Sequence, residues 1–183
     1  YPEAALAEAE ALSLDVLQRL DPLRRDLRDR FVITIDPVDA RDFDDAISLE
    51  RTLEGGYKLG VHIADVSHYV AWDGHIDLEA RHRTTSVYLA DRVLPMLPER
   101  LSNDLCSLRP DEDRLAFTVD IELDAQGRVR HYDPYPSVIR SRVRMDYDGA
   151  EALLVRAGAV EYSVLEGAAE DVAVAEASRE KSA

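Results

Sequence analysis

The feature that most constrains this chain is a run of acidic residues between two short β-like segments. Five aspartates fall within residues 36–45 of the segment T-I-D-P-V-D-A-R-D-F-D-D-A. The β-branched run before it should end at Asp36, because Pro37 cannot donate a hydrogen bond within a sheet. The next strand-like run starts at Asp45, which leaves Asp42 and Asp44 on the connecting turn. The fold can therefore bring four carboxylates together at one edge of a sheet.

Carboxylates that converge in this way need a counter-charge. Two of them about 4 Å apart repel by roughly 4 kcal/mol at an effective dielectric near 20, whereas whole domains are stable by only about 5 to 15 kcal/mol. Without a cation the cluster would have to protonate or spread apart. Oxygen ligands with no His or Cys nearby favour a hard ion, and the sequence lacks the D-x-D-x-D-G loop of an EF-hand. The pattern favours Mg²⁺, or Mn²⁺ in its place, at Asp36, Asp42, Asp44 and Asp45.

The residues alone leave several interpretations of the acidic run open. A bound ion could hold a phosphate oxygen and lower the pKa of a bound water, which gives phosphodiester hydrolysis as a hypothesis. The run could instead be a solvated loop, because aspartate is common in turns. A haloacid-dehalogenase-type phosphotransferase requires an acid two residues after the first one, and Val38 occupies that position. Arg41 would either neutralise part of the cluster or contact a phosphate.

The rest of the sequence predicts an α+β fold, a mainly antiparallel sheet with flanking helices. Gly55 and Gly56 suit a hairpin between strands at 46–50 and 57–66. Alternation from Leu115 to Leu123 predicts a strand that buries its apolar residues and exposes its polar ones. The following segment should be extended but interrupted by prolines. Further expectations are a helical lead-in at 1–25, helices at 76–82, from an Asp148 cap to 156 and at 161–183, an ordered loop at 94–110, and extended chain at 128–144.

Length, charge and cysteine content bound the class of protein. The 183 residues correspond to about one domain, and no apolar run reaches the ~20 residues of a membrane-spanning helix. A single cysteine, Cys106, and no recognisable leader favour the reducing cytoplasm. A net charge of -15 argues against non-specific coating of nucleic acid. Much of the acid lies in the 36–45 run and in the Ala/Glu-rich ends, however, so net charge does not describe any one groove.

Three co-linear motifs give the chain a family resemblance. The acidic motif is followed by G-V-H-I-A-D-V-S-H and by T-S-V-Y-L-A-D-R-V-L-P-M-L-P-E-R-L-S-N-D-L-C-S-L. Together they closely resemble the ribonuclease II / ribonuclease R family over about Asp26 to Gly149. The resemblance implies a processive, hydrolytic 3′→5′ exoribonuclease that uses Mg²⁺ to release nucleoside 5′-monophosphates from single-stranded RNA. Residues 26–183 would then be the N-terminal part of an RNB-type catalytic domain.

Matched position by position, the resemblance assigns roles to individual residues. It makes Asp36, Asp42, Asp44 and Asp45 the four active-site aspartates. Asp36 and Asp45 are the implied direct metal ligands, and Asp44 is the acid most closely tied to the chemical step. Tyr88 resembles a tyrosine that clamps nucleotides near the 3′ end, although a core aromatic is the alternative reading. Thr84 stands where the family often has glycine.

Part of the family's machinery cannot be located in this sequence. A second aromatic clamp, further acidic residues and an arginine near the phosphate are not found, and neither are the flanking oligonucleotide-binding barrels. The chain would then need the rest of the catalytic domain as a partner. A non-catalytic RNA-binding or scaffold fragment is therefore an alternative, and a metal-binding acidic module with no role on nucleic acid is a third hypothesis.

Other polar residues have weaker functional readings. His62 and His68 flank Asp65, but histidines six positions apart on a strand do not aim at one ion, so we interpret them as structural. Cys106 is expected to be buried rather than reactive. The segment R-S-R-V-R places Arg140, Arg142 and Arg144 on one strand face. These arginines could contact successive phosphates of an RNA backbone, or they could be ordinary solvated side chains on a strand edge.

Overall fold

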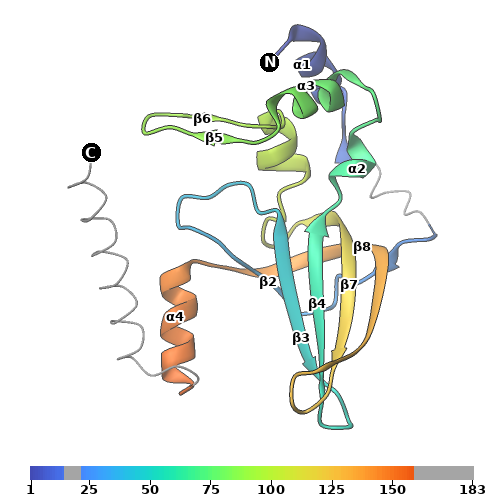
Figure 1. Cartoon of the computed structure of the whole chain (residues 1–183), viewed down its shortest axis with the longest axis vertical. Coiled ribbons are helices and arrows are strands. Elements are labelled where there is room, and N and C mark those ends of the chain that lie inside the picture. The colour runs from blue at the N-terminus through green and yellow to red at the C-terminus, as the bar shows by residue number, and fades with distance from the viewer. Residues whose placement is uncertain (15–21, 159–183) are drawn as a thin grey trace. The chain divides into compact units, whose positions relative to one another are not determined.

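The computed structural model of the protein describes residues 1–14 and 22–158. They fall into two compact units, the first from Tyr1 to Arg144 and the second from Met145 onward. The first unit combines a mainly antiparallel sheet with helices, which confirms the predicted α+β class (Figure 1). Within the helical lead-in predicted at 1–25, α1 spans Glu3–Glu10, and residues 15–21 lie outside the described residues. Residues 22–24 form a turn and Arg25 begins a short strand, so the helical prediction is wrong there.

Five strands of the first unit close into a ring. These strands are β2 (Val32–Ile35), β3 (Asp45–Arg51), β4 (Tyr57–Ala64), β7 (Asp113–Leu123) and β8 (Val129–Met145). Each pairs with the next in the order β8-β2-β3-β4-β7, and β8 also pairs with β7, so the sheet forms a small barrel. A sixth, two-residue strand, β1 (Arg25–Asp26), runs parallel to β8.

The strand β8 continues through its two prolines, so the predicted interruption is wrong. Pro134 lies opposite Val119 and Pro136 opposite Phe117 in the β7–β8 register. The carbonyl of Val138, two residues further along, accepts from the Leu27 N–H on the side of β1. Residues two apart in a strand direct their backbone N–H and C=O groups to the same side. Pro134 and Pro136 therefore face the same side as Val138, away from β7, and the N–H groups that they lack would have pointed to that side. The β7–β8 ladder therefore loses no donor.

The interior of the barrel holds several polar residues, and over Phe117–Asp120 the orientation of β7 is the reverse of the predicted one, although Leu115 is buried as predicted. Thr118 and Asp120 are buried, whereas Phe117 is 45% exposed. A chain of hydrogen bonds crosses the interior, from Ser48 to His62 (3.0 Å), from His62 to Thr118 (2.8 Å) and from Thr118 to Ser137 (2.7 Å). His62 is thus a structural residue, as predicted. The Tyr135 ring, 5% exposed, belongs to the same inner row as His62 and Thr118.

The outer surface of the barrel carries the apolar residues instead. Ile33, Ile47, Val61 and Val119 lie side by side on four neighbouring strands. Leu49, Leu59 and Ile121 form the next row, and Ile63 and Phe117 the row beside Asp45. Leu49, Ile63 and Phe117 are all exposed. This outer apolar face ends at Asp45, one of the four aspartates of the acidic run.

Helices and a hairpin lie at one end of the barrel (Figure 1). They are α2 (Val66–Tyr69), α3 (His75–Arg83), the hairpin of β5 (Val87–Tyr88) and β6 (Val93–Leu94), and η2, a π-helical turn at Leu101–Leu105. The hydrophobic core of the unit is shared between these elements and the strand ends, with Ile76, Leu101, Leu105 and Leu115 fully buried. The π-helical turn corrects the prediction of an irregular loop throughout 94–110.

The described part of the second unit is one helix, α4 (Tyr147–Arg156). Its cap is Asp146, whose carboxylate accepts the Gly149 N–H at 2.7 Å. The prediction of a helix here is confirmed, but Asp148 lies in the first turn and is not the cap. The helix predicted at 161–183 lies outside the described residues. Within 1–14 and 22–158, no helix has the length and apolar character needed to span a membrane.

Candidate active site

The barrel places two of the four aspartates at adjoining strand ends. Asp36 directly follows β2, and Asp45 is the first residue of β3. In the antiparallel pairing of these strands, Val32 lies opposite Ser48 and Ile33 opposite Ile47. Continued to the strand ends, this register brings the chain before Asp36 next to Asp45. The local pattern in the sequence was sufficient to predict this arrangement.

The other two aspartates are set on either side of a buried anchor. Phe43 is 5% exposed and belongs to the core, while Asp42 and Asp44 line the same pocket as Asp36 and Asp45. At the start of the loop, the Ala40 N–H donates to the Pro37 carbonyl at 3.0 Å and forms a turn. The loop therefore directs alternate side chains to the core and to the pocket, and all four carboxylates reach one site.

The charges in this site are crowded. Burial and the Asp45 carboxylate raise the pKa of Asp36, and its Oδ2 atom is buried without a hydrogen-bond partner. Asp44 is exposed to solvent, yet its carboxyl group is partly desolvated by the surrounding protein, and this desolvation raises its pKa. The carboxylates of Asp42, Asp45 and Asp36 raise it further. An unpartnered buried carboxylate oxygen among like charges is an environment that a cation would relieve.

The donor set suits a magnesium ion held by few protein ligands. No three His, Cys, Asp or Glu side chains in the described parts of the chain are arranged around one metal position. Mg²⁺ does not require such a cage, because it commonly keeps several waters and binds one or two carboxylates together with substrate phosphates. Asp36 and Asp45 at the adjoining strand ends are the pair best placed for this, with the unpartnered Oδ2 of Asp36 as a free ligand atom.

Tyr88 comes to the same pocket from the β5–β6 hairpin. Its hydroxyl donates to Oδ2 of Asp42 at 3.2 Å, and the negative charge of Asp42 raises the tyrosine pKa. The residue is 67% exposed, so it is not the core aromatic of the alternative reading. The pocket has a volume of about 750 Å³. Its lining residues are Asp36, Pro37, Asp39, Ala40, Arg41, Asp42, Asp44, Asp45, Ser86, Tyr88, Arg92, Val93, Pro95, Glu99, Ser102 and Asn103.

Several of these lining residues were missed by the sequence analysis. Ser86, Arg92, Ser102 and Asn103 all belong to the third motif, so the signal was present, but nothing in their spacing indicated that they face the acidic run. Thr84, just before the hairpin, has a φ of 66°, a backbone conformation that favours glycine. This agrees with the glycine that the related family often has there.

The three predicted arginines are engaged in different contacts. Arg140 forms an ion pair with Asp113 at 2.7 Å, and Arg142 donates to the Arg28 carbonyl at 3.0 Å. Arg144 donates to the carbonyls of Pro37 (3.0 Å) and Val38 (2.5 Å) in the acidic loop. Of the three, the structure thus brings Arg144 to the site, and contact of this row with RNA stays a prediction.

Comparison with known proteins shows a family match over most of the chain. The model of the RNB domain matches residues 24–179. Ribonuclease R of Thermotoga maritima is 53% identical over 154 residues, which are 84% of this chain and 22% of that protein. The chain therefore spans less than a quarter of the length of this relative.

The similar solved structures include further members of the ribonuclease R group. RNase R of Mycoplasma genitalium, in complex with ribose-methylated single-stranded RNA, superposes with a TM-score of 0.81 at 39% identity. The match covers 85% of this chain and 24% of that one. Yeast Ssd1, described as a pseudonuclease, matches with a TM-score of 0.65 at 21% identity over 75% of this chain and 17% of its own. This last likeness concerns the fold alone.

Proposed function

This chain belongs to the RNB domain family, and from that premise we propose that it forms the acidic part of the active site of a Mg²⁺-dependent 3′→5′ exoribonuclease. The substrate is single-stranded RNA and the products are nucleoside 5′-monophosphates. Mn²⁺ can replace Mg²⁺. One observation carries the proposal: four aspartates and an exposed tyrosine line a single pocket of about 750 Å³. The RNA named with the related Mycoplasma enzyme supports the substrate class.

The aspartates divide the work of hydrolysis between them. Asp36 and Asp45 would bind the metal ion directly, and the negative charges of Asp42 and Asp44 would strengthen its binding. When bound, the ion would neutralise the phosphate and activate a water. Asp44 has a raised pKa and reaches solvent through the pocket, so it can accept a proton from the attacking water. Asp42 completes the charge of the site and accepts the hydroxyl hydrogen bond of Tyr88.

Tyr88 supplies binding that does not depend on base identity. An exposed aromatic face can stack on a nucleobase, an interaction worth about 1 to 3 kcal/mol with little sequence preference. Its hydroxyl bond to Asp42 fixes the ring beside the carboxylates. The base that stacks on Tyr88 would therefore belong to a nucleotide close to the scissile phosphate, as degradation from a 3′ end requires.

The remainder of the catalytic domain is the partner that this chain requires. The outer apolar face of the barrel, with exposed Leu49, Ile63 and Phe117, begins beside Asp45. Apolar area of this extent normally packs against protein, and the related ribonuclease R is more than four times longer than the matched region. Further RNB-domain chain covers this face and supplies the positive charge for phosphate binding, and oligonucleotide-binding domains outside this chain guide the RNA. The whole protein acts in the cytoplasm, in keeping with the buried, unpaired Cys106.

A non-catalytic RNA-binding scaffold is the second candidate. The fold is shared with a protein described as a pseudonuclease, so the fold by itself does not imply cleavage. The four carboxylates favour catalysis, because a scaffold gains nothing from crowding charges that raise the pKa of Asp36 and Asp44.

The decisive experiment follows RNA degradation by the chain and by a longer RNB-domain protein that contains it. Single-stranded RNA labelled at its 5′ end is incubated with and without Mg²⁺. We expect labelled products that shorten from the 3′ end, nucleoside 5′-monophosphates by mass spectrometry, and a loss of about 10²-fold to 10⁴-fold in rate for Asp44→Asn. Asp133→Asn is the matched control, since that residue pairs with Arg25 and lies outside the pocket. RNA binding without degradation by the longer protein would favour the scaffold.

A further inference from the structure

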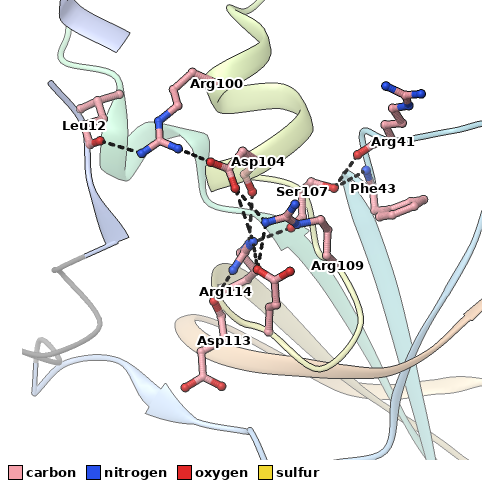
Figure 2. A network of polar contacts seen from close by, with 10 residues as sticks. Leu12, Arg41, Phe43, Arg100, Asp104, Ser107, Arg109, Asp113 and Arg114 are labelled. Carbon is pink, nitrogen blue, oxygen red and sulfur yellow. Dashed lines mark hydrogen bonds and ion pairs between the residues drawn. The ribbon is translucent and has the colours of Figure 1, made fainter. Parts of the chain in front are cut away.

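The loop that carries Asp42 and Asp44 is held by a residue more than sixty positions away. The Ser107 hydroxyl donates to the Arg41 carbonyl at 2.7 Å and accepts the Phe43 N–H at 3.2 Å. Figure 2 shows the Ser107 side chain reaching both backbone groups. These two hydrogen bonds lie immediately before and immediately after Asp42. One buried side chain therefore fixes the backbone on both sides of an active-site carboxylate.

Two further backbone bonds extend this support to Asp44. The Leu108 N–H donates to the Phe43 carbonyl at 2.9 Å, and the Ala64 N–H donates to the Asp44 carbonyl at 2.9 Å. Consecutive residues 107 and 108 thus bind three backbone groups of the loop, the Arg41 carbonyl and the N–H and carbonyl of Phe43. The Phe43 ring, buried between the two acids, adds an apolar anchor. The loop is therefore held to the segment 107–108 by hydrogen bonds to its backbone.

Ser107 is itself fixed by a buried arginine. Arg114, at the start of β7, is 1% exposed, and its Nε donates to the carbonyls of Ser107 (2.9 Å) and Asp104 (3.2 Å). Its guanidinium also pairs with Glu112 at 2.5 Å. Arg109 bonds to Asp104 at 2.8 Å in the same network (Figure 2). The position of Ser107 is thereby tied to the barrel and not only to its own turn.

The acidic loop needs such an attachment because its side chains repel one another. Four carboxylates share one pocket, and their repulsion favours any backbone movement that spreads them. A hydroxyl that binds the loop backbone opposes this movement without adding a charge or a ligand to the pocket. Residues that orient metal ligands from outside commonly change metal affinity or activity by about 10- to 100-fold when they are removed.

We propose that Ser107 is a positioning residue, which holds Asp42 and Asp44 in the geometry that binds the divalent ion. The proposal rests on the function proposed above, since it concerns the same site. Its chemistry is that of a single hydroxyl acting as donor to one backbone group and acceptor from another.

The test compares Ser107→Ala with Ser107→Thr and with Ser137→Ala in the full 183-residue chain. Ser137 is the matched control because it is also fully buried and its hydroxyl bonds to Thr118 (2.7 Å) and Ala116 (3.3 Å) inside the barrel. Mn²⁺ affinity is read from the free-ion signal in electron paramagnetic resonance, and exchange of the Phe43 amide hydrogen is read by NMR. Thermal unfolding without metal confirms that each variant folds.

We expect Ser107→Ala to weaken Mn²⁺ binding about tenfold or more and to accelerate exchange of the Phe43 amide. Ser107→Thr keeps the hydroxyl and should recover most of the affinity, while Ser137→Ala should bind Mn²⁺ like the wild-type chain. Equal weakening by Ser107→Ala and Ser137→Ala, or unchanged affinity in Ser107→Ala, would overturn the positioning role. A wild-type chain that does not bind Mn²⁺ would instead overturn the proposed metal site itself.

Discussion

Lowering the pH should destabilise this protein through one buried histidine. His62 is fully buried in the barrel, with Nε2 3.0 Å from the Ser48 hydroxyl and Nδ1 2.8 Å from the Thr118 hydroxyl. Burial lowers its pKa from 6.5 to about 4, and the nearby positive charge of Arg30 contributes to this shift. Protonation of His62 in the folded state is therefore unfavourable, whereas the unfolded chain protonates it at its ordinary value.

The size of the effect follows from these two pKa values. Because the unfolded state binds the proton first, the free energy of unfolding falls as the pH drops below 6.5. For a shift from 6.5 to about 4, linkage gives a loss of about 1.2 kcal/mol between pH 7 and pH 5.5 and about 2.4 kcal/mol between pH 7 and pH 4.5. Asp36 and Asp44 have raised pKa values and contribute with the opposite sign in the acidic part of this range.

Urea unfolding followed by circular dichroism from pH 7 to pH 4.5 measures the effect, with His62→Gln as the reference. The contributions of Asp36 and Asp44 are common to both proteins, so the difference between the two curves isolates His62. The wild-type chain should lose about 2 kcal/mol more than His62→Gln over this range. Parallel curves for the two proteins would refute the reasoning, because they would mean that His62 is not buried in its neutral form.

Three further predictions concern other parts of the molecule. Thr84→Gly should raise the free energy of unfolding by about 1 kcal/mol in urea, since φ is 66° there, and a loss would show that the threonine side chain is needed. Asp120→Asn should lower the free energy of unfolding by about 3 kcal/mol, because Arg30 and Lys58 lose the carboxylate that lies 2.6 and 3.0 Å from them. An unchanged melting temperature would contradict this. Tyr88→Ala should weaken single-stranded RNA binding by about 1 to 3 kcal/mol in fluorescence anisotropy, while Tyr88→Phe keeps the stacking face. Equal weakening by both variants would assign the role to the hydroxyl instead.

Local patterns in the sequence were sufficient to predict strands β2, β3, β4 and β7 and the acidic run that connects β2 to β3. The run before Asp36 is β-branched and ends at Pro37, and the run after Asp45 is followed by the turn at Gly55 and Gly56, so neighbouring residues determine both strands. Convergence of the four carboxylates followed because the two strands pair through a short connection. The role of these residues in metal binding and catalysis stays a proposal.

The orientation of β7 could not be predicted from its own residues. Alternation correctly indicated a strand, but which of its two faces turns inward depends on the residues that the other strands place inside the ring. Closure of the five strands is a property of the whole sheet, and it brings Thr118 within hydrogen-bond distance of His62 and Ser137. The interior is closely packed at Gly60. A Cβ atom on Gly60 would lie 2.4 Å from the Ser48 hydroxyl. Phe117 therefore faces outward, onto the surface that we assign to the rest of the domain.

The site therefore depends on two supports of different origin. Asp36 and Asp45 are placed by the antiparallel pairing of β2 with β3 in the barrel. Asp42 and Asp44 are placed by Ser107 and Leu108, which reach the loop across more than sixty residues of sequence. Only the first support is encoded locally. A chain could thus keep all four aspartates and still lose the geometry of the site through a single change at Ser107, so the acidic motif alone is not sufficient to identify an active member of this family.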